Sequence, residues 1–102
     1  MTSEEKSFVM KNMVDNLSIL RSRLNISQEQ LAGLIGVTRQ TISTFESGQR
    51  KMTWSVFLAL VLIFFRNEPT KNLLVALGIY TPELNGFLNI SKNEGGKQNG
   101  VY

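Results

Sequence analysis

The sequence predicts an all-α fold of five or six short helices. Two observations favour it. Apolar side chains recur at helical intervals near the start of the chain, and hydroxyl residues that suit helix N-caps precede several later apolar segments. The chain has 102 residues, which suits one domain with a single modest core. The sequence contains no internal repeat and no sign of a second domain.

The first helix is expected from about Phe8 to Leu24. Its apolar residues are spaced by four, three and four positions, which keeps them on one helix face. They are Met13, Leu17, Leu20 and Leu24. Residues 1–7 are polar and acidic, do not resemble a signal peptide, and are expected to form a flexible arm.

Two short helices should follow. Ser27 and Gln30 form a capping box that opens the second helix. Gly36 comes after this helix, where a left-handed backbone is favourable only for glycine. Thr38 is a suitable N-cap for the third helix, which Gly48 ends. The residues of the second helix expected to face the core are Leu31, Leu34 and Ile35.

Thr53 suits the N-cap of a fourth helix, from Trp54 to about Phe65. The segment "VFLALVLIFF" within it has ten apolar residues, whereas a membrane-spanning helix needs roughly 20. Its propensity alone also allows a buried strand, but its length and its helical neighbours favour a helix. A helix that is apolar on all sides must be buried on all sides. It is therefore either the central core helix or part of an intersubunit contact.

A fifth helix should carry Leu73, Leu74 and Leu77 and close at Gly78. A sixth should begin at Thr81-Pro82, because proline suits the first helical turn, and continue to about Leu88. The last residues, 91–102, are rich in Gly and Asn and are expected to be disordered.

The composition narrows the function. Net charge is +3 and the pI about 9.5, and the excess of cations lies within residues 21–51, which permits an anionic partner. The chain has no cysteine and no histidine, which excludes disulfides, the usual zinc sites and histidine-dependent catalysis. Its carboxylates and hydroxyls are isolated. We therefore expect no enzyme, no cofactor, no metal and no membrane association, and a cytoplasmic location.

The third helix has an unusual surface. Between Thr38 and Ser47 the large apolar residues are Ile42 and Phe45, which lie three apart and form one narrow stripe. The other side chains of this helix must face outward. Merely solvated faces usually carry Glu, Lys and Ala, whereas Arg, Gln, Thr and Ser suit hydrogen bonds to base-pair edges. This face indicates a helix that contacts DNA.

The second and third helices are predicted to form a helix-turn-helix. Ala32 is small where the two helices cross, Gly36 makes the turn, and Val37 fills the angle between them. Such a pair, at roughly 90–120°, lets the second helix of the motif enter a major groove. The core of the motif comprises Leu31, Ala32, Ile35, Gly36, Val37, Ile42 and Phe45.

The segment "SQEQLAGLIGVTRQTISTFESGQRK" is similar to the helix-turn-helix of the lambda-repressor-like family, also called the XRE or Cro/repressor family. The likeness extends over about residues 14–65 and implies a lambda-repressor-like DNA-binding domain. Together with the helices expected from the residues, this gives a flexible arm at 1–7, the DNA-binding domain at 8–66, continuous C-terminal helices for dimerisation at 67–90, and a disordered tail at 91–102.

The resemblance also implies roles for individual residues. Arg39 suits hydrogen bonds to the O6 and N7 atoms of guanine, and Gln40 suits hydrogen bonds to adenine. The base-reading set is Thr38, Arg39, Gln40, Thr41 and Thr44. The phosphate-contacting set is Gln28, Ser43, Ser47, Gln49, Arg50 and Lys51. An ion pair between Arg21 and Glu46 should link the first helix to the third. Two positions depart from the family pattern. Thr44 is shorter than the Gln that the family often has there, and Met52-Thr53 stands before the fourth helix where the family more often has a basic residue followed by Pro.

Simpler interpretations remain open for these residues. Exposed Arg and Gln side chains are usually only solvated. Arg50 and Lys51 also suit a soluble loop, and Arg21 and Glu46 are compatible with unrelated surface charges.

The leading interpretation is a regulator, a repressor, that binds double-stranded DNA sequence-specifically as a homodimer on a palindromic operator. It would be a bacterial or phage protein associated with the nucleoid. The alternative is an antitoxin-like module that binds a small toxin partner and its own promoter. The dimer interface is expected among apolar residues from the fourth helix onward, namely Phe64, Phe65, Leu74, Leu77, Tyr80, Leu84 and Phe87.

Overall fold

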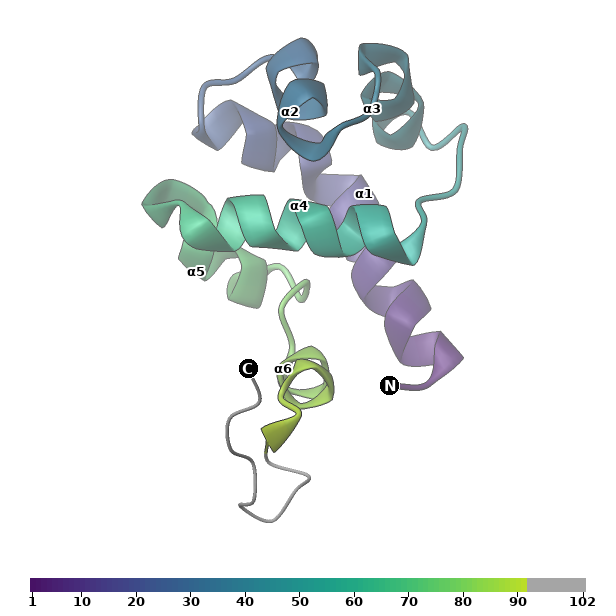
Figure 1. Ribbon diagram of the computed structural model, residues 1–102, viewed down its shortest axis with the longest axis vertical. Coiled ribbons are helices and arrows are strands. Elements are labelled where there is room, and N and C mark those ends of the chain that lie inside the picture. The colour runs from purple at the N-terminus through teal and green to yellow at the C-terminus, as the bar shows by residue number, and fades with distance from the viewer. Residues whose placement is uncertain (92–102) are drawn as a thin grey trace.

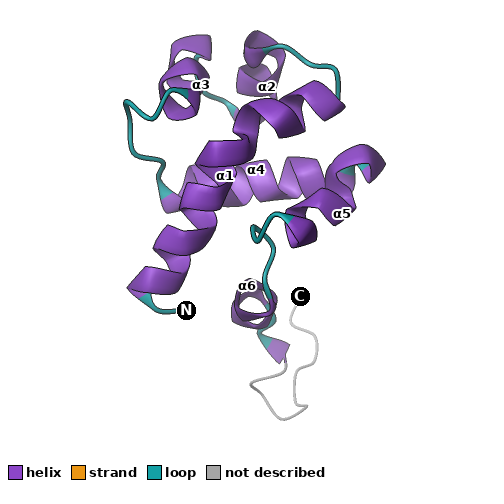
Figure 2. Cartoon of the chain, turned by 180° about the vertical axis from the view of Figure 1, so that it is seen from behind, coloured by secondary structure: helices purple, strands orange, loops and turns teal. Residues whose placement is uncertain are grey.

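The computed structural model describes residues 1–91 and contains, within that range, six α-helices and no strand (Figures 1 and 2). The helices are α1 (Ser3–Arg23), α2 (Gln28–Ile35), α3 (Arg39–Glu46), α4 (Trp54–Arg66), α5 (Glu68–Ala76) and α6 (Pro82–Leu88). The predicted all-α class is confirmed, and α4 excludes a strand at "VFLALVLIFF". No helix in this range is long and apolar enough to cross a membrane. From residue 92 onward, the expected disordered tail lies outside the described residues.

The helix starts follow local hydrogen bonds that the sequence predicts. The Ser27 hydroxyl accepts from the Gln30 N–H at 3.0 Å, and the Gln30 side chain accepts from the Ser27 N–H at 2.8 Å. The hydroxyls of Thr53 and Thr81 each accept from the N–H three residues on, at 3.3 and 3.1 Å. These contacts satisfy N–H groups that a helix leaves without a partner in its first turn. The predicted caps of α2, α4 and α6 are therefore confirmed.

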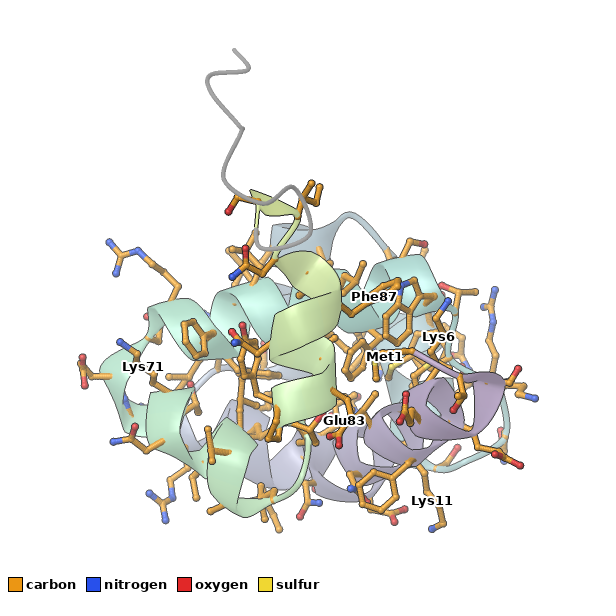
Figure 3. The ribbon with its side chains drawn as sticks, turned by 90° about the horizontal axis from the view of Figure 1, so that it is seen from below. Met1, Lys6, Lys11, Lys71, Glu83 and Phe87 are labelled. Atoms are coloured by element: carbon orange, nitrogen blue, oxygen red, sulfur yellow. The ribbon has the colours of Figure 1, made fainter. Side chains whose placement is uncertain are left out.

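The expected flexible arm at 1–7 is wrong, because α1 begins at Ser3. Thr2 and Glu5 form a second capping box, in which the Thr2 hydroxyl accepts from the Glu5 N–H at 3.0 Å. The first turns of α1 are also held by tertiary contacts. The Lys6 ammonium lies 5.0 Å from the ring centre of Trp54 and 5.3 Å from that of Phe87 (Figure 3). The arm is thus a capped helical extension that joins α1 to α4 and α6.

Leu34 does not face the core as expected and is 59% exposed. Residues advance about 100° around a helix, and the buried side of α2 is centred between Leu31 and Ala32. Ile35 falls within this arc and is half-buried, whereas Leu34 falls beyond its edge. The neighbouring helices cover this arc of α2 and leave Leu34 outside it.

Three of the residues expected at a dimer interface belong instead to the monomer core. Phe64, Leu74 and Leu84 each have 0% exposure. The buried hydroxyl of Thr70 donates to the carbonyl of Phe64 at 2.6 Å, which folds α5 back against α4. Val9, in the first turn of the helix expected from Phe8, is buried as well. The single domain therefore accommodates more large apolar side chains than its length suggested.

Candidate nucleic-acid interface

The second and third helices form the predicted helix-turn-helix at one end of the molecule, beyond α4 (Figure 1). Gly36 has a φ of +80°, the left-handed conformation that glycine adopts without strain. The N–H groups of Gly36 and Val37 both donate to the carbonyl of Ala32, at 2.9 and 3.0 Å. Ile42 and Phe45 anchor α3, with exposures of 0% and 2%. The first turn of α3, with Arg39 and Gln40, is exposed and points away from the core.

The five predicted base-reading residues divide into two groups. Arg39 and Gln40 are exposed on the first turn of α3. The hydroxyls of Thr38 and Thr41 lie 3.0 Å apart and bond to each other, and the Thr44 hydroxyl donates to the carbonyl of Thr41 at 3.0 Å. The three threonines therefore stabilise the helix start, and their methyl groups remain for apolar contact. Arg39 and Gln40 are the long polar side chains exposed on this turn.

A chain of hydrogen bonds connects α1, α2 and α3 through polar side chains. Arg21 donates to both carboxylate oxygens of Glu46, at 2.9 and 3.1 Å, which confirms the predicted ion pair. The Gln28 amide nitrogen donates to the same carboxylate at 3.0 Å. The Gln28 amide oxygen accepts from the Arg39 guanidinium at 3.2 Å. Gln28 thus links the end of α3 to the residue at its exposed start.

The Arg21–Glu46 pair is largely sheltered from water, with side-chain exposures of 20% and 11%. Burial by itself raises the pKa of Glu46. Hydrogen bonds from Arg21 and Gln28, together with the charge of Arg21, outweigh this and lower the pKa below its ordinary value. The hydrogen bond to Glu46 raises the pKa of Arg21. Both groups are therefore charged at neutral pH.

We expect Arg21→Met and Glu46→Gln to show strong coupling in a double-mutant cycle on the free energy of unfolding. Removing one partner leaves a sheltered charge without its counterion, so the coupling energy should be about 1–3 kcal/mol. The matched control is the exposed Lys11–Asp15 pair, with an N–O distance of 2.9 Å and exposures of 74% and 52%. There we expect at most about 0.5 kcal/mol. Additive losses for Arg21 and Glu46 would contradict the pairing.

The lowered pKa of Glu46 gives this pair a definite pH dependence. Its stabilising contribution is fully present above the ordinary pKa of 4.5 and is lost as pH falls through the lower, folded-state pKa. The stability difference between the wild type and Glu46→Gln should therefore shrink below pH 4.5. Urea titrations at a series of pH values measure this difference.

The predicted phosphate-contacting residues lie along the start of α2, the outer side of α3 and the loop that follows it. Gln28 and Ser43 are half-buried; the exposed members are Ser47, Gln49, Arg50 and Lys51. Gly48 starts the loop with a φ of +78°. Arg50 does not extend freely, because its guanidinium donates to the Thr41 hydroxyl at 3.4 Å and lies 5.8 Å from the ring centre of Phe45. The structure therefore places cations beside the exposed turn of α3.

Sequence reasoning missed two features of this site. It did not connect Arg50 to Thr41, nor Lys11 of α1 to the loop after α3, although Lys11 and Lys51 line the same cleft. Neither feature has a signal in the local sequence, because each depends on how distant segments pack. Among the described residues, no group of three His, Cys, Asp or Glu side chains is placed to hold a metal ion.

Comparison with known proteins agrees with the geometry. Residues 13–63 match the family model described as "Helix-turn-helix domain", a span that contains the whole of α2, α3 and the Arg21–Glu46 pair. No curated protein and no solved structure matches the chain. The matched span covers half of the chain, from within α1 to within α4. The chain therefore belongs to the helix-turn-helix domain family, of the XRE and lambda-repressor-like type, whose helix-turn-helix binds DNA.

Proposed function

We propose that this protein is a sequence-specific repressor that binds an operator in double-stranded DNA as a homodimer. The observation that carries the proposal is the outward face of α3, where Arg39 and Gln40 are exposed on a helix fixed by buried and hydrogen-bonded contacts. In this proposal the protein has no catalytic activity. It is located in the cytoplasm, in association with the nucleoid.

The chain of hydrogen bonds supports base reading by Arg39. A guanidinium has five N–H donors in a rigid plane, and Gln28 accepts from one of its nitrogens. The other donors remain available for the O6 and N7 atoms of guanine, the commonest specific contact in major grooves. Gln28 is held in turn by Glu46. The protein therefore positions the Arg39 side chain before DNA arrives, which reduces the entropy lost on binding.

The direct test of the proposed function is selection of duplexes from a random pool by the full chain, followed by footprinting. We expect a palindromic consensus whose half-sites are about 34 Å apart, because paired helix-turn-helix units read successive major grooves on one side of the DNA. If the selection enriched no sequence and the protein bound all duplexes alike in a salt-sensitive way, sequence-specific reading would be contradicted.

Lys51→Ala should weaken binding to the operator and to random DNA alike. Lys51 is exposed on the loop beyond α3, where a side chain meets the phosphate backbone and not base edges. The slope of log affinity against log salt should fall by about one unit. Titrations at several salt concentrations measure it. The control is Lys71→Ala on α5, distant from Lys11 and the loop in Figure 3, which should leave the slope unchanged.

An apolar groove on α4 is the surface that we propose for dimerisation. It has a volume of about 370 Å³, and α4 contributes Leu58, Leu62 and Phe65, one stripe along the helix. Tyr80 and Leu88 complete it from beyond α5. Leu62 is 67% exposed in the monomer. Four members of the expected interface retain exposure, and two of them, Phe65 and Tyr80, line the groove; the other two are Leu77 and Phe87.

The position of this groove suits a two-fold dimer that reads two half-sites. Figures 1 and 2, taken from opposite sides, show α1 crossing one side of α4 and leaving its other side uncovered. The helices α2 and α3 lie at one end of the long axis of the molecule (Figure 1). A two-fold axis parallel to this long axis, beside the uncovered side of α4, would bring α3 of both copies to the same end. Both could then enter one face of the DNA.

We expect Leu62→Glu to convert the dimer to a monomer without unfolding it. The new charge would be desolvated in the dimer but solvated in the monomer, so it penalises association alone. Sedimentation at tens of micromolar protein, without DNA, measures the assembly state, and a thermal melt checks the fold. The matched control is Val75→Glu on α5, where the native side chain is 60% exposed outside the groove. A monomeric wild type would refute the proposed homodimer.

The antitoxin-like alternative would use the same apolar groove to hold a small toxin. The two proposals differ in what occupies the groove in the purified protein. A second small protein that co-purifies with the wild type but not with Leu62→Glu would favour the antitoxin. A wild type that is a homodimer on its own would favour the regulator.

A further inference from the structure

A second cleft lies between α1 and the loop that follows α3. The face of α1 that lines it includes Met10, Lys11 and Val14, and the loop contributes Arg50, Lys51 and Met52. Its volume is about 230 Å³, below the roughly 300 Å³ at which sites for drug-sized molecules begin. The cleft therefore suits a small ligand.

The polar and apolar residues of this cleft are segregated. Met52 is buried and Met10 and Val14 are half-buried, so they form an apolar floor. The three cations, Lys11, Arg50 and Lys51, are exposed at the rim.

The rim carries an uncompensated positive charge. No carboxylate lines the cleft, and within residues 1–91 Lys51 makes no salt bridge. Lys11 is paired with Asp15, but that pair is highly exposed and therefore weak. A cationic rim above an apolar floor selects a ligand with an anionic head and an apolar body.

We propose that this cleft binds a small amphipathic organic anion, with its carboxylate or phosphate on Lys51 and Arg50 and its apolar body on the floor. The consequence for regulation rests on the proposed function. The same two cations would contact the DNA backbone, so a ligand that occupies them competes with phosphate. The bound anion would act as an inducer that lowers the affinity for DNA.

The first experiment titrates the ¹⁵N-labelled full chain with hexanoate, hexyl phosphate and the neutral hexanol, and follows its backbone amides by NMR. We expect saturable shifts at Val14, Met52 and the loop amides with at least one of the two anions. The anion that binds more tightly identifies the head group. If neither anion saturates these shifts, or if hexanol binds as tightly as both, the proposed site is wrong.

Variants test each part of the cleft. Lys51→Gln should weaken anion binding about tenfold, because it removes a charge-assisted contact. Lys71→Gln, a cation outside the cleft, should leave anion binding unchanged. Val14→Phe should abolish binding by filling the floor. If Val14→Phe does not fold, Met10→Phe, on the same face of α1, is the floor variant used instead. Unchanged anion affinity in a folded floor variant would contradict the site.

The final arm separates this inference from the proposed function. Hexanoate or hexyl phosphate should weaken binding to duplex DNA in the wild type but not in the folded floor variant, with sodium chloride matching the ionic strength. A protein that binds DNA but neither anion refutes the cleft alone. A protein that binds an anion in the cleft but no DNA refutes the proposed function and leaves the site in place.

Discussion

Replacing Leu74 with Ala should lower the free energy of unfolding by about 2–5 kcal/mol, the usual cost of truncating a buried leucine. Leu74 has 0% exposure, and its carbonyl accepts the N–H groups of both Ile79 and Tyr80 at 2.9 Å, where the chain turns after α5. Truncation would leave a cavity between α5 and the helices it packs against, which the hydrogen-bonded turn could not easily collapse. Urea titration measures the loss, and the neighbouring Val75→Ala, at a position 60% exposed, should cost less than about 0.5 kcal/mol.

The Leu74 experiment also decides between core and interface. Truncation of a core residue destabilises the monomer itself. The loss of unfolding free energy for Leu74→Ala should therefore not depend on protein concentration. If instead the variant kept its stability and only dissociated on dilution, Leu74 would belong to a subunit contact.

Replacing Arg39 with Ala should cost roughly 1–3 kcal/mol on the operator and much less on random DNA. Arg39 lies on the exposed first turn of α3, where side chains reach base edges, and Gln28 holds its guanidinium in place. Its loss therefore removes a sequence-dependent contact, whereas the loss of Lys51 removes a sequence-independent one. Parallel titrations against both duplexes measure the difference.

Two controls make the Arg39 result interpretable. Lys71→Ala removes a positive charge on α5 and should change neither affinity. Because the Lys71 ammonium lies 5.2 Å from the ring centre of Phe65 in the proposed dimer groove, sedimentation of this variant should also show an unchanged dimer. Circular dichroism should show an unchanged fold, because Arg39 is exposed and its described contact is the single hydrogen bond to Gln28. Equal weakening on operator and random DNA would make Arg39 a phosphate clamp and would overturn the assigned reading face.

The capping residues show what local sequence determines. A helix start depends on hydrogen bonds among residues three or four apart, so Ser27, Thr53 and Thr81 could be identified without any tertiary information. Thr2 and Glu5 carried the same signal, a hydroxyl followed three residues later by a glutamate. The arm was expected there only because its polar composition resembles that of a loose terminus.

The Arg21–Glu46 pair shows what a family motif determines. The two residues are 25 positions apart, and nothing in their local sequence brings them together. The register of the helix-turn-helix fixes their separation, so the resemblance was sufficient to predict the contact. The same register did not determine the direction of Arg50, which turns back onto Thr41 and Phe45.

The sequence by itself determined the helices, their caps and the register of the helix-turn-helix, because these depend on contacts within a few residues and on a fixed motif. The tertiary structure alone decided which apolar residues remain on the surface. Leu84 is fully buried, whereas Leu62 and Leu34 are exposed, although all three are leucines on short helices. Burial depends on which distant helix covers a given face, and the packing of the six helices against one another settles that.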